Sequence, residues 1–146
     1  MKKNILVSAC LLGESCRYDG KSKPCERVMA LKDTYNLIPI CPEVMGGLPT
    51  PRVPSEICGE RVLMKDGRDV SENYNRGAQK ALEIARQNAC TVAILKEKSP
   101  SCGSGLIHNG LFDGGFVDGD GITTRLLKNE GIRVLGESEI TEDFAL

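Results

Sequence analysis

The stretch that decides the fold is NILVSACLLG, residues 4–13. Its apolar centre, Ile5 to Val7, is short and continuous, which is typical of a parallel strand buried on both faces. Two later runs, LIPI at 37–40 and TVAIL at 91–95, have the same character. Pro39 lacks a backbone N–H, so the second of these strands is expected at an edge of the sheet.

Helical patterns alternate with these runs. Residues 25–35 and 70–88 carry apolar positions at helical spacing, and Asp69 with Glu72 has the spacing of a capping box. A last helix is expected from Ile122 and ends at Gly131, before a final strand at 132–135. The turn signal at 65–67 predicts a hairpin between 61–64 and 68–70, and the glycine-rich segment 103–121 is expected to form a turn-rich lid.

This order predicts an α/β fold in a single domain, residues 1–146. We expect an open, mostly parallel, four-stranded sheet of Rossmann-like form with helices on both faces, plus a small β-hairpin insertion.

Composition excludes several classes of function. The 146 residues include 19 basic and 20 acidic side chains, a net charge of −1, which argues against a general nucleic-acid-binding surface. Tryptophan is absent, so a base-stacking platform is not expected either. No apolar run approaches the roughly 20 residues that span a bilayer. We therefore expect a cytoplasmic protein without nucleic-acid or membrane partners; the oligomeric state stays open.

Cysteine is the unusual residue, with seven in the chain. An odd number cannot all pair within the chain, and a reducing compartment disfavours disulfides. Cys10 and Cys41 directly follow the first and second predicted strands, and Cys102 comes shortly after the third. Because parallel strands end at one edge of a sheet, we expect these three thiols to meet at the edge where such sheets bind ligands. Cys16 could join them as a fourth ligand or as a thiol that contacts the ligands, whereas core or surface positions are expected for Cys25, Cys58 and Cys90.

Three thiolates could hold several groups. Zinc takes four protein ligands, or three and a water, but its usual close cysteine pairs are missing. Thiolates also select iron–sulfur clusters, and three ligands on a cubane leave one iron open for a substrate. A redox thiol pair is a third alternative, although no thioredoxin-type motif is present.

Three longer motifs resemble a known family. The first is SACLLG at 8–13 with CRYDG at 16–20, the second is CPE at 41–43 with GGLPTPR at 46–52, and the third is SPSCG at 99–103. In this order they resemble the signatures of a bacterial family long catalogued as a domain of unknown function. That family is related to thiouracil desulfidase, an iron–sulfur enzyme.

The resemblance implies a [4Fe-4S] cluster bound by Cys10, Cys41 and Cys102, with Glu43 and Ser101 as the catalytic acid–base pair. It implies non-redox desulfuration of a small thiolated compound: the substrate sulfur binds the open iron, a water activated by Glu43 attacks the carbon, and Ser101 relays a proton. The motifs do not fix thiouracil as the substrate. The alternative is a non-catalytic iron–sulfur or sulfide-binding protein that delivers sulfur.

Two further residues are expected to bind substrate. Arg52 stands between Pro51 and Pro54, which hold its backbone, and could clamp an anion or a substrate; the alternative is a solvated surface charge. Ser99 belongs to a group of hydroxyls around Cys102 that could hydrogen-bond sulfur or an anion. His108, the only histidine, lies beside a predicted turn and is expected at the surface.

Overall fold

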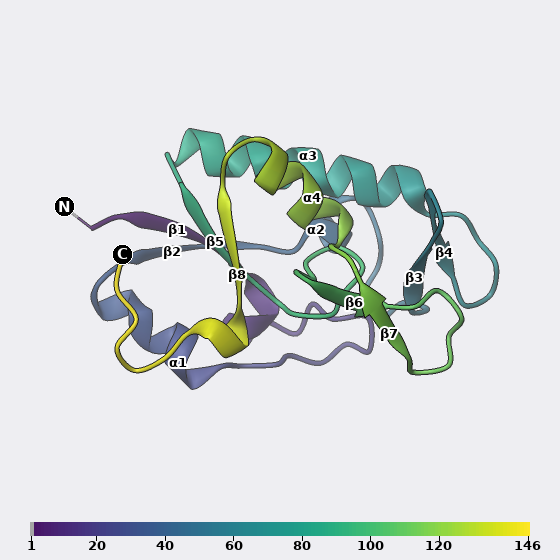
Figure 1. Ribbon diagram of the computed structural model, residues 1–146, viewed down its shortest axis with the longest axis horizontal. Helices are drawn as coiled ribbons and strands as arrows, with labels where there is room; N and C mark the ends of the chain where they lie inside the picture. Colours follow the sequence, from purple (N-terminus) through teal and green to yellow (C-terminus); the bar gives the residue numbers. More distant parts are fainter. Residues whose placement is uncertain (1) are drawn as a thin grey trace.

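The computed structural model describes residues 2–146 and is built on a four-stranded, all-parallel sheet (Figure 1). The strand order is β2-β1-β5-β8. The bounds are Asn4–Ser8 for β1, Asn36–Ile40 for β2, Val92–Leu95 for β5 and Arg133–Gly136 for β8. The three apolar runs of the sequence therefore lie side by side. Pro39 stands opposite Val7 on the edge strand β2, as its missing N–H predicted.

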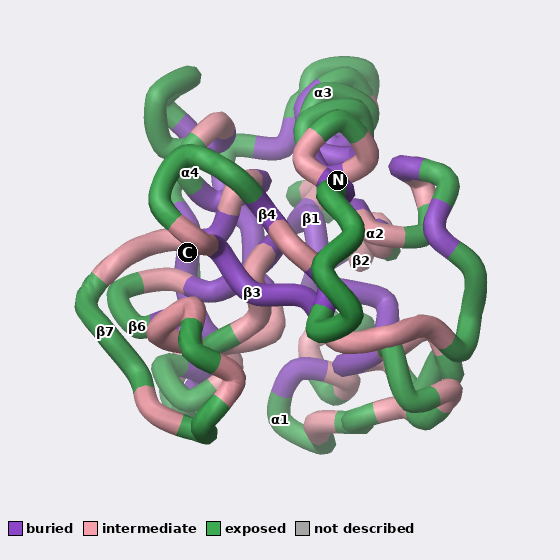
Figure 2. Tube along the Cα trace, turned by 90° about the vertical axis from the view of Figure 1, so that its right-hand side faces the viewer, coloured by how far each residue is buried: buried purple, intermediate pink, exposed green. Residues whose placement is uncertain are grey.

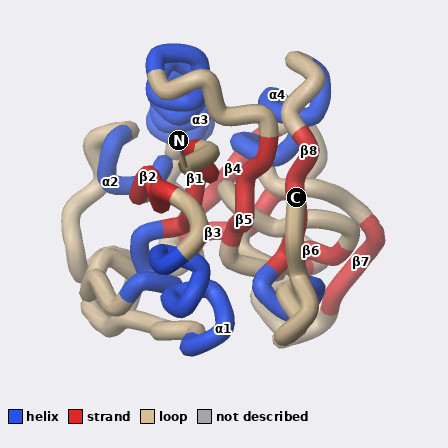
Figure 3. Tube along the Cα trace, turned by 90° about the vertical axis from the view of Figure 1, so that its left-hand side faces the viewer, coloured by secondary structure: helices blue, strands red, loops and turns tan. Residues whose placement is uncertain are grey.

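Helices cover both faces of this sheet (Figure 3). Leu6 and Ala93 point to one face, where they pack with α3 (Ser71–Gln87) and α4 (Ile122–Asn129). Ile5 and Val7 point to the other, which is covered by α1 (Glu26–Met29) and the 3-10 helices η1 (Ala9–Leu12), η2 (Ala30–Asp33) and η3 (Glu137–Glu139). The predicted α/β fold class is thus confirmed. Among residues 2–146, no helix is long and apolar enough to cross a membrane.

Helix α3 forms where the apolar periodicity predicted it, but its start differs in detail. Tyr74, Ala81 and Ala85 lie on its buried face, and the outer face is exposed (Figure 2). The residue before its first turn is Val70, so the expected capping box is wrong. Asp69, the residue before Val70, instead accepts a hydrogen bond from the N–H of Ser71 at 2.9 Å, which forms an Asx turn.

The hairpin insertion is present with a different partner strand. β4 (Arg61–Met64) pairs antiparallel with β3 (Ser55–Cys58), and residues 68–70 return only as a single bridge between Leu63 and Asp69. β3 begins directly after Pro54, where consecutive backbone N–H groups become available for pairing. A second hairpin, β6 (Leu106–His108) with β7 (Phe116–Asp118), lies in the glycine-rich segment. Its three-residue strands are too short for alternation to reveal them.

A short helix, α2 (Pro42–Met45), packs backbone to backbone against α3. A Cβ atom added at Gly77 would lie 1.8 Å from the carbonyl oxygen of Pro42, and one added at Gly46 would lie 2.0 Å from that of Asn73. Only glycine permits this approach. The contact fixes the position of Glu43, which α2 carries.

Candidate functional site

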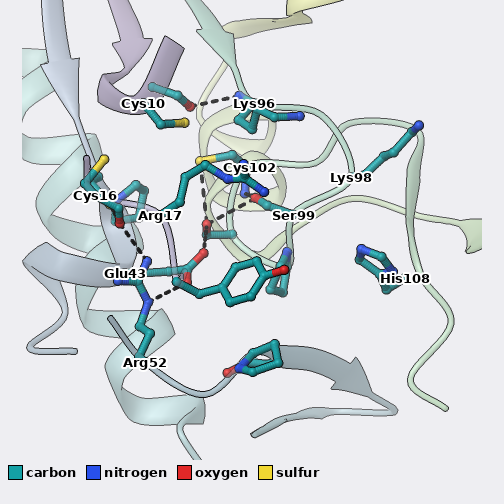
Figure 4. A pocket seen from close by; sticks show the side chains of 18 of the residues that line it. Cys10, Cys16, Arg17, Glu43, Arg52, Lys96, Lys98, Ser99, Cys102 and His108 are labelled. Carbon is teal, nitrogen blue, oxygen red and sulfur yellow. Dashed lines mark hydrogen bonds and ion pairs between the residues drawn. The ribbon is translucent and has the colours of Figure 1, made fainter. Parts of the chain in front are cut away.

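A cavity of about 540 Å³ opens where β1, β2 and β5 end (Figure 4). All three predicted cysteines line it: Cys10 in η1, Cys41 directly before α2, and Cys102 in the loop after β5. Cys10 and Cys102 are buried and Cys41 is half-buried. Thiols from distant parts of the sequence therefore share one cavity, which follows from the parallel strand order.

Cys16 lies among these thiols. Its interaction with the Cys10 thiol is the main reason why the pKa of Cys16 is raised to about 11, and its interaction with Cys41 acts in the opposite direction. The contact with Cys16, together with burial, also raises the pKa of Cys41 well above its usual range. The Cys41 thiol is 3.7 Å from the carbonyl oxygen of Cys16. A sequence separation of six residues from Cys10 could not by itself establish this contact.

The Cys102 thiol is held separately. Burial raises its pKa to about 12, while hydrogen bonds with Ser8 and Ser101 act in the opposite direction. The Ser101 hydroxyl oxygen is 3.6 Å from the sulfur. At neutral pH the Cys102 thiol therefore keeps its proton, and a soft cationic group that binds this sulfur must displace that proton.

Glu43 and Ser101, the predicted acid–base pair, are in direct contact. The Ser101 hydroxyl donates to Oε2 of Glu43 at 2.9 Å, and Nε of Arg52 donates to Oε1 at 3.1 Å. The Glu43 and Arg52 side chains are only 14% and 3% exposed. Both oxygens of the Glu43 carboxylate are therefore held, one by the Arg52 guanidinium and the other by the hydroxyl of Ser101, the residue before Cys102.

Arg52 and Ser99, the residues expected to bind substrate, line the cavity but also bond to the protein. Arg52 donates to the carbonyl oxygens of Pro49 and Cys16 and to the Thr50 hydroxyl, as well as to Glu43. The Ser99 hydroxyl accepts a hydrogen bond from the N–H of Cys102 at 2.7 Å. Their roles toward a substrate stay predictions.

The far wall of the cavity contains two residues for which the sequence predicted no role at the site. His108 is half-buried there rather than at the surface, and the centre of its ring lies 4.8 Å from that of Phe116. Its Nδ1 is buried and has no hydrogen-bond partner among residues 2–146. Lys98 has a left-handed backbone, with φ +71°, and its ammonium lies 5.1 Å from the Phe116 ring. Figure 4 shows both residues across the cavity from Glu43. No sequence motif includes Lys98, and the hairpin that carries His108 was not predicted.

Two other residues at the site were not singled out by the sequence. Tyr74 belongs to the apolar stripe of the helix predicted over 70–88; it is buried but also lines the cavity, where the nearby Glu43 carboxylate adds to burial in raising its pKa. Glu56 accepts hydrogen bonds from the N–H groups of Gly110 and Phe112, at 2.9 and 3.2 Å, and so attaches the glycine-rich loop to β3. The remaining cysteines, Cys25, Cys58 and Cys90, are not among the residues that line the cavity.

The three thiols are the donor type that an iron–sulfur cluster requires. Among the described residues, 2–146, no three His, Cys, Asp or Glu side chains form a group that could hold one metal ion. An iron–sulfur cluster distributes its thiolate ligands around a body of several atoms, and its preferred donors are sulfur. Cys10, Cys41 and Cys102, free thiols in one cavity, fit this requirement.

Known proteins resemble this chain in sequence and in fold. An uncharacterised protein of Bacillus subtilis (strain 168), YbbK, is 43% identical over 148 residues, which cover 94% of this chain and 98% of the relative. The solved structure of the [4Fe-4S]-dependent thiouracil desulfidase TudS superposes with a TM-score of 0.90 at 48% identity, covering 95% of this chain and 93% of that chain. The profile of the 2-thiouracil desulfurase family matches residues 5–139. These matches extend over nearly the whole chain, and we conclude that the protein belongs to the 2-thiouracil desulfurase family.

Proposed function

We propose that the protein removes sulfur from a small thiolated compound by hydrolysis, with a [4Fe-4S] cluster held by Cys10, Cys41 and Cys102. The observation that carries this proposal is the contact between Ser101 and Glu43, 2.9 Å, in the cavity that the three thiols line. A sulfur carrier needs thiols alone. A carboxylate and a hydroxyl in contact beside those thiols are what proton transfer requires, and they favour an enzyme.

The overall reaction converts C=S and water into C=O and H₂S, and no electrons are gained or lost. Cys10, Cys41 and Cys102 would hold the cluster, which would supply a Lewis acid for the thiocarbonyl sulfur. Glu43 accepts a proton from the attacking water at its carboxylate. The Ser101 hydroxyl, already hydrogen-bonded to Oε2, passes a proton toward the departing sulfur.

The cavity supports a small substrate. Its volume of about 540 Å³ lies within the roughly 300–1,000 Å³ that is usual for small-molecule sites. The wall combines apolar surface with a few directed polar groups, which is the usual composition of such a site.

The test separates cluster binding from proton transfer. Glu43→Gln and Ser101→Ala should keep the iron content of the wild type and lose roughly 10²–10⁴-fold in desulfuration rate, the usual size of a general acid–base contribution. Glu130→Gln, at an exposed carboxylate that follows α4 and pairs with Arg86 of α3, serves as the control and should retain full activity. Full activity of the Glu43 variant would refute the assigned role. A cluster-loaded wild type that desulfurates no thiolated base would favour the sulfur-delivery alternative.

A further inference from the structure

We infer that Arg52 is a positioning residue: its guanidinium holds the Glu43 carboxylate against Ser101 and ties α2 to the loop that carries Cys16. This inference rests on the proposed function. It assigns to Arg52 a task different from the substrate clamp expected from the sequence.

The contacts of Arg52 connect separate parts of the site. Nε donates to Glu43 at 3.1 Å, and one terminal nitrogen donates to the carbonyl oxygen of Cys16 at 3.0 Å. The other terminal nitrogen donates to Pro49 at 3.0 Å and to Thr50 at 3.1 Å. The guanidinium therefore joins the first motif, the proline loop and α2.

The backbone of the same residue strengthens this arrangement. The N–H of Arg52 donates to the carbonyl oxygen of Tyr18 at 2.7 Å, so both main chain and side chain attach to the segment 16–18. The side chain is 3% exposed. Arg52 cannot shift without disturbing the loop of Cys16 and the carboxylate of Glu43 together.

The donor count separates positioning from substrate binding. A guanidinium has five N–H donors, and four hydrogen bonds to the protein leave one for any other partner. A clamp for an anion normally presents two parallel donors to its ligand. A lysine ammonium is a compact point charge and cannot serve these three directions at once. Arg52→Lys therefore keeps the positive charge and removes the planar arrangement of hydrogen-bond donors.

The experiment compares Arg52→Lys with wild type, both loaded anaerobically and assayed on 2-thiouracil. We expect kcat to fall about 10²-fold, since a 1 Å misplacement of a reacting group costs about that much, while KM and iron content stay at wild-type values. In Arg52→Ala, added guanidinium ion should restore part of kcat. Arg86→Lys, at the exposed pair with Glu130, is the matched control and should leave both constants unchanged.

Several results would overturn the inference. A KM raised tenfold or more with unchanged kcat would make Arg52 a substrate clamp, and lost iron would make it a residue of cluster assembly. An Arg52→Lys variant with both constants unchanged would leave it no role. If the wild type itself is inactive, the proposed function fails, but a crystal structure of the loaded Arg52→Lys variant still tests the positioning role. In that variant the Glu43 carboxylate should move away from the Ser101 hydroxyl. A Glu43–Ser101 hydrogen bond retained within about 3.2 Å would refute positioning.

Discussion

Gly77→Ala tests whether the packing of α2 on α3 positions the site. The new Cβ would lie 1.8 Å from the carbonyl oxygen of Pro42, so the helices must separate by about 1.6 Å to reach van der Waals contact. Replacing a helical glycine with alanine normally stabilises by about 0.5–1 kcal/mol, but overpacking of this kind costs about 1–3 kcal/mol. The cost of the clash therefore exceeds the gain from alanine, and we expect the free energy of unfolding to fall by about 1–2 kcal/mol.

The effect on activity should exceed the effect on stability. Pro42 stands between Cys41 and Glu43, so a shift of α2 moves a proposed cluster ligand and the proposed base together. A displacement above 1 Å should lower the desulfuration rate by about 10²-fold. Denaturant unfolding and steady-state kinetics measure the two effects, with the exposed Gln79→Ala on the same helix as control. An alanine variant as active as wild type and more stable would refute the close backbone contact.

Two further predictions concern the cluster-free protein. Burial raises the pKa of Cys102 from 9.0 to about 12, so above pH 9 the unfolded chain binds fewer protons than the native one and stability falls with rising pH. At pH 10 this one thiol should cost about 1.4 kcal/mol of stability relative to pH 7.5. Cys16 and Cys41, whose pKa values are also raised, add to the fall, so urea unfolding should show a decrease that Cys102→Ala lessens by about that amount; a pH-independent wild type would contradict it. Glu56→Ala removes the acceptor for two N–H groups of the loop 109–115, so limited proteolysis should cleave that loop faster than in wild type, and equal rates would show that Glu56 does not hold it.

The elements that the sequence could predict are those with long, continuous signals. The three buried strands and α3 carry apolar patterns that can be recognised within each segment, without knowing its contacts with the rest of the chain. The position of Cys10, Cys41 and Cys102 at strand ends then follows from topology, because parallel strands place their carboxyl ends together. The sequence alone therefore predicts that the three thiols share one edge of the sheet.

The features that escaped prediction depend on long-range contacts. The partner of β4 was misjudged because a nearby turn signal does not reveal that β3, on the other side of β4, makes the better register. Tyr74 fits the buried stripe of a helix, and no periodicity tells a core tyrosine from one that reaches a cavity. The Arg52–Glu43 pair joins residues nine positions apart across a proline loop, whose path only the folded chain defines.

The most direct test of the central claim is the iron and sulfide content of anaerobically reconstituted protein. We predict about four irons and four sulfides per chain for the wild type, and loss of most iron in Cys10→Ser, Cys41→Ser and Cys102→Ser, because a serine hydroxyl is a poor ligand for iron. Cys25→Ser and Cys90→Ser, outside the cavity wall, should stay fully loaded. A wild type that binds no iron, or ligand variants that keep their full complement, would contradict a cluster held by these three thiols.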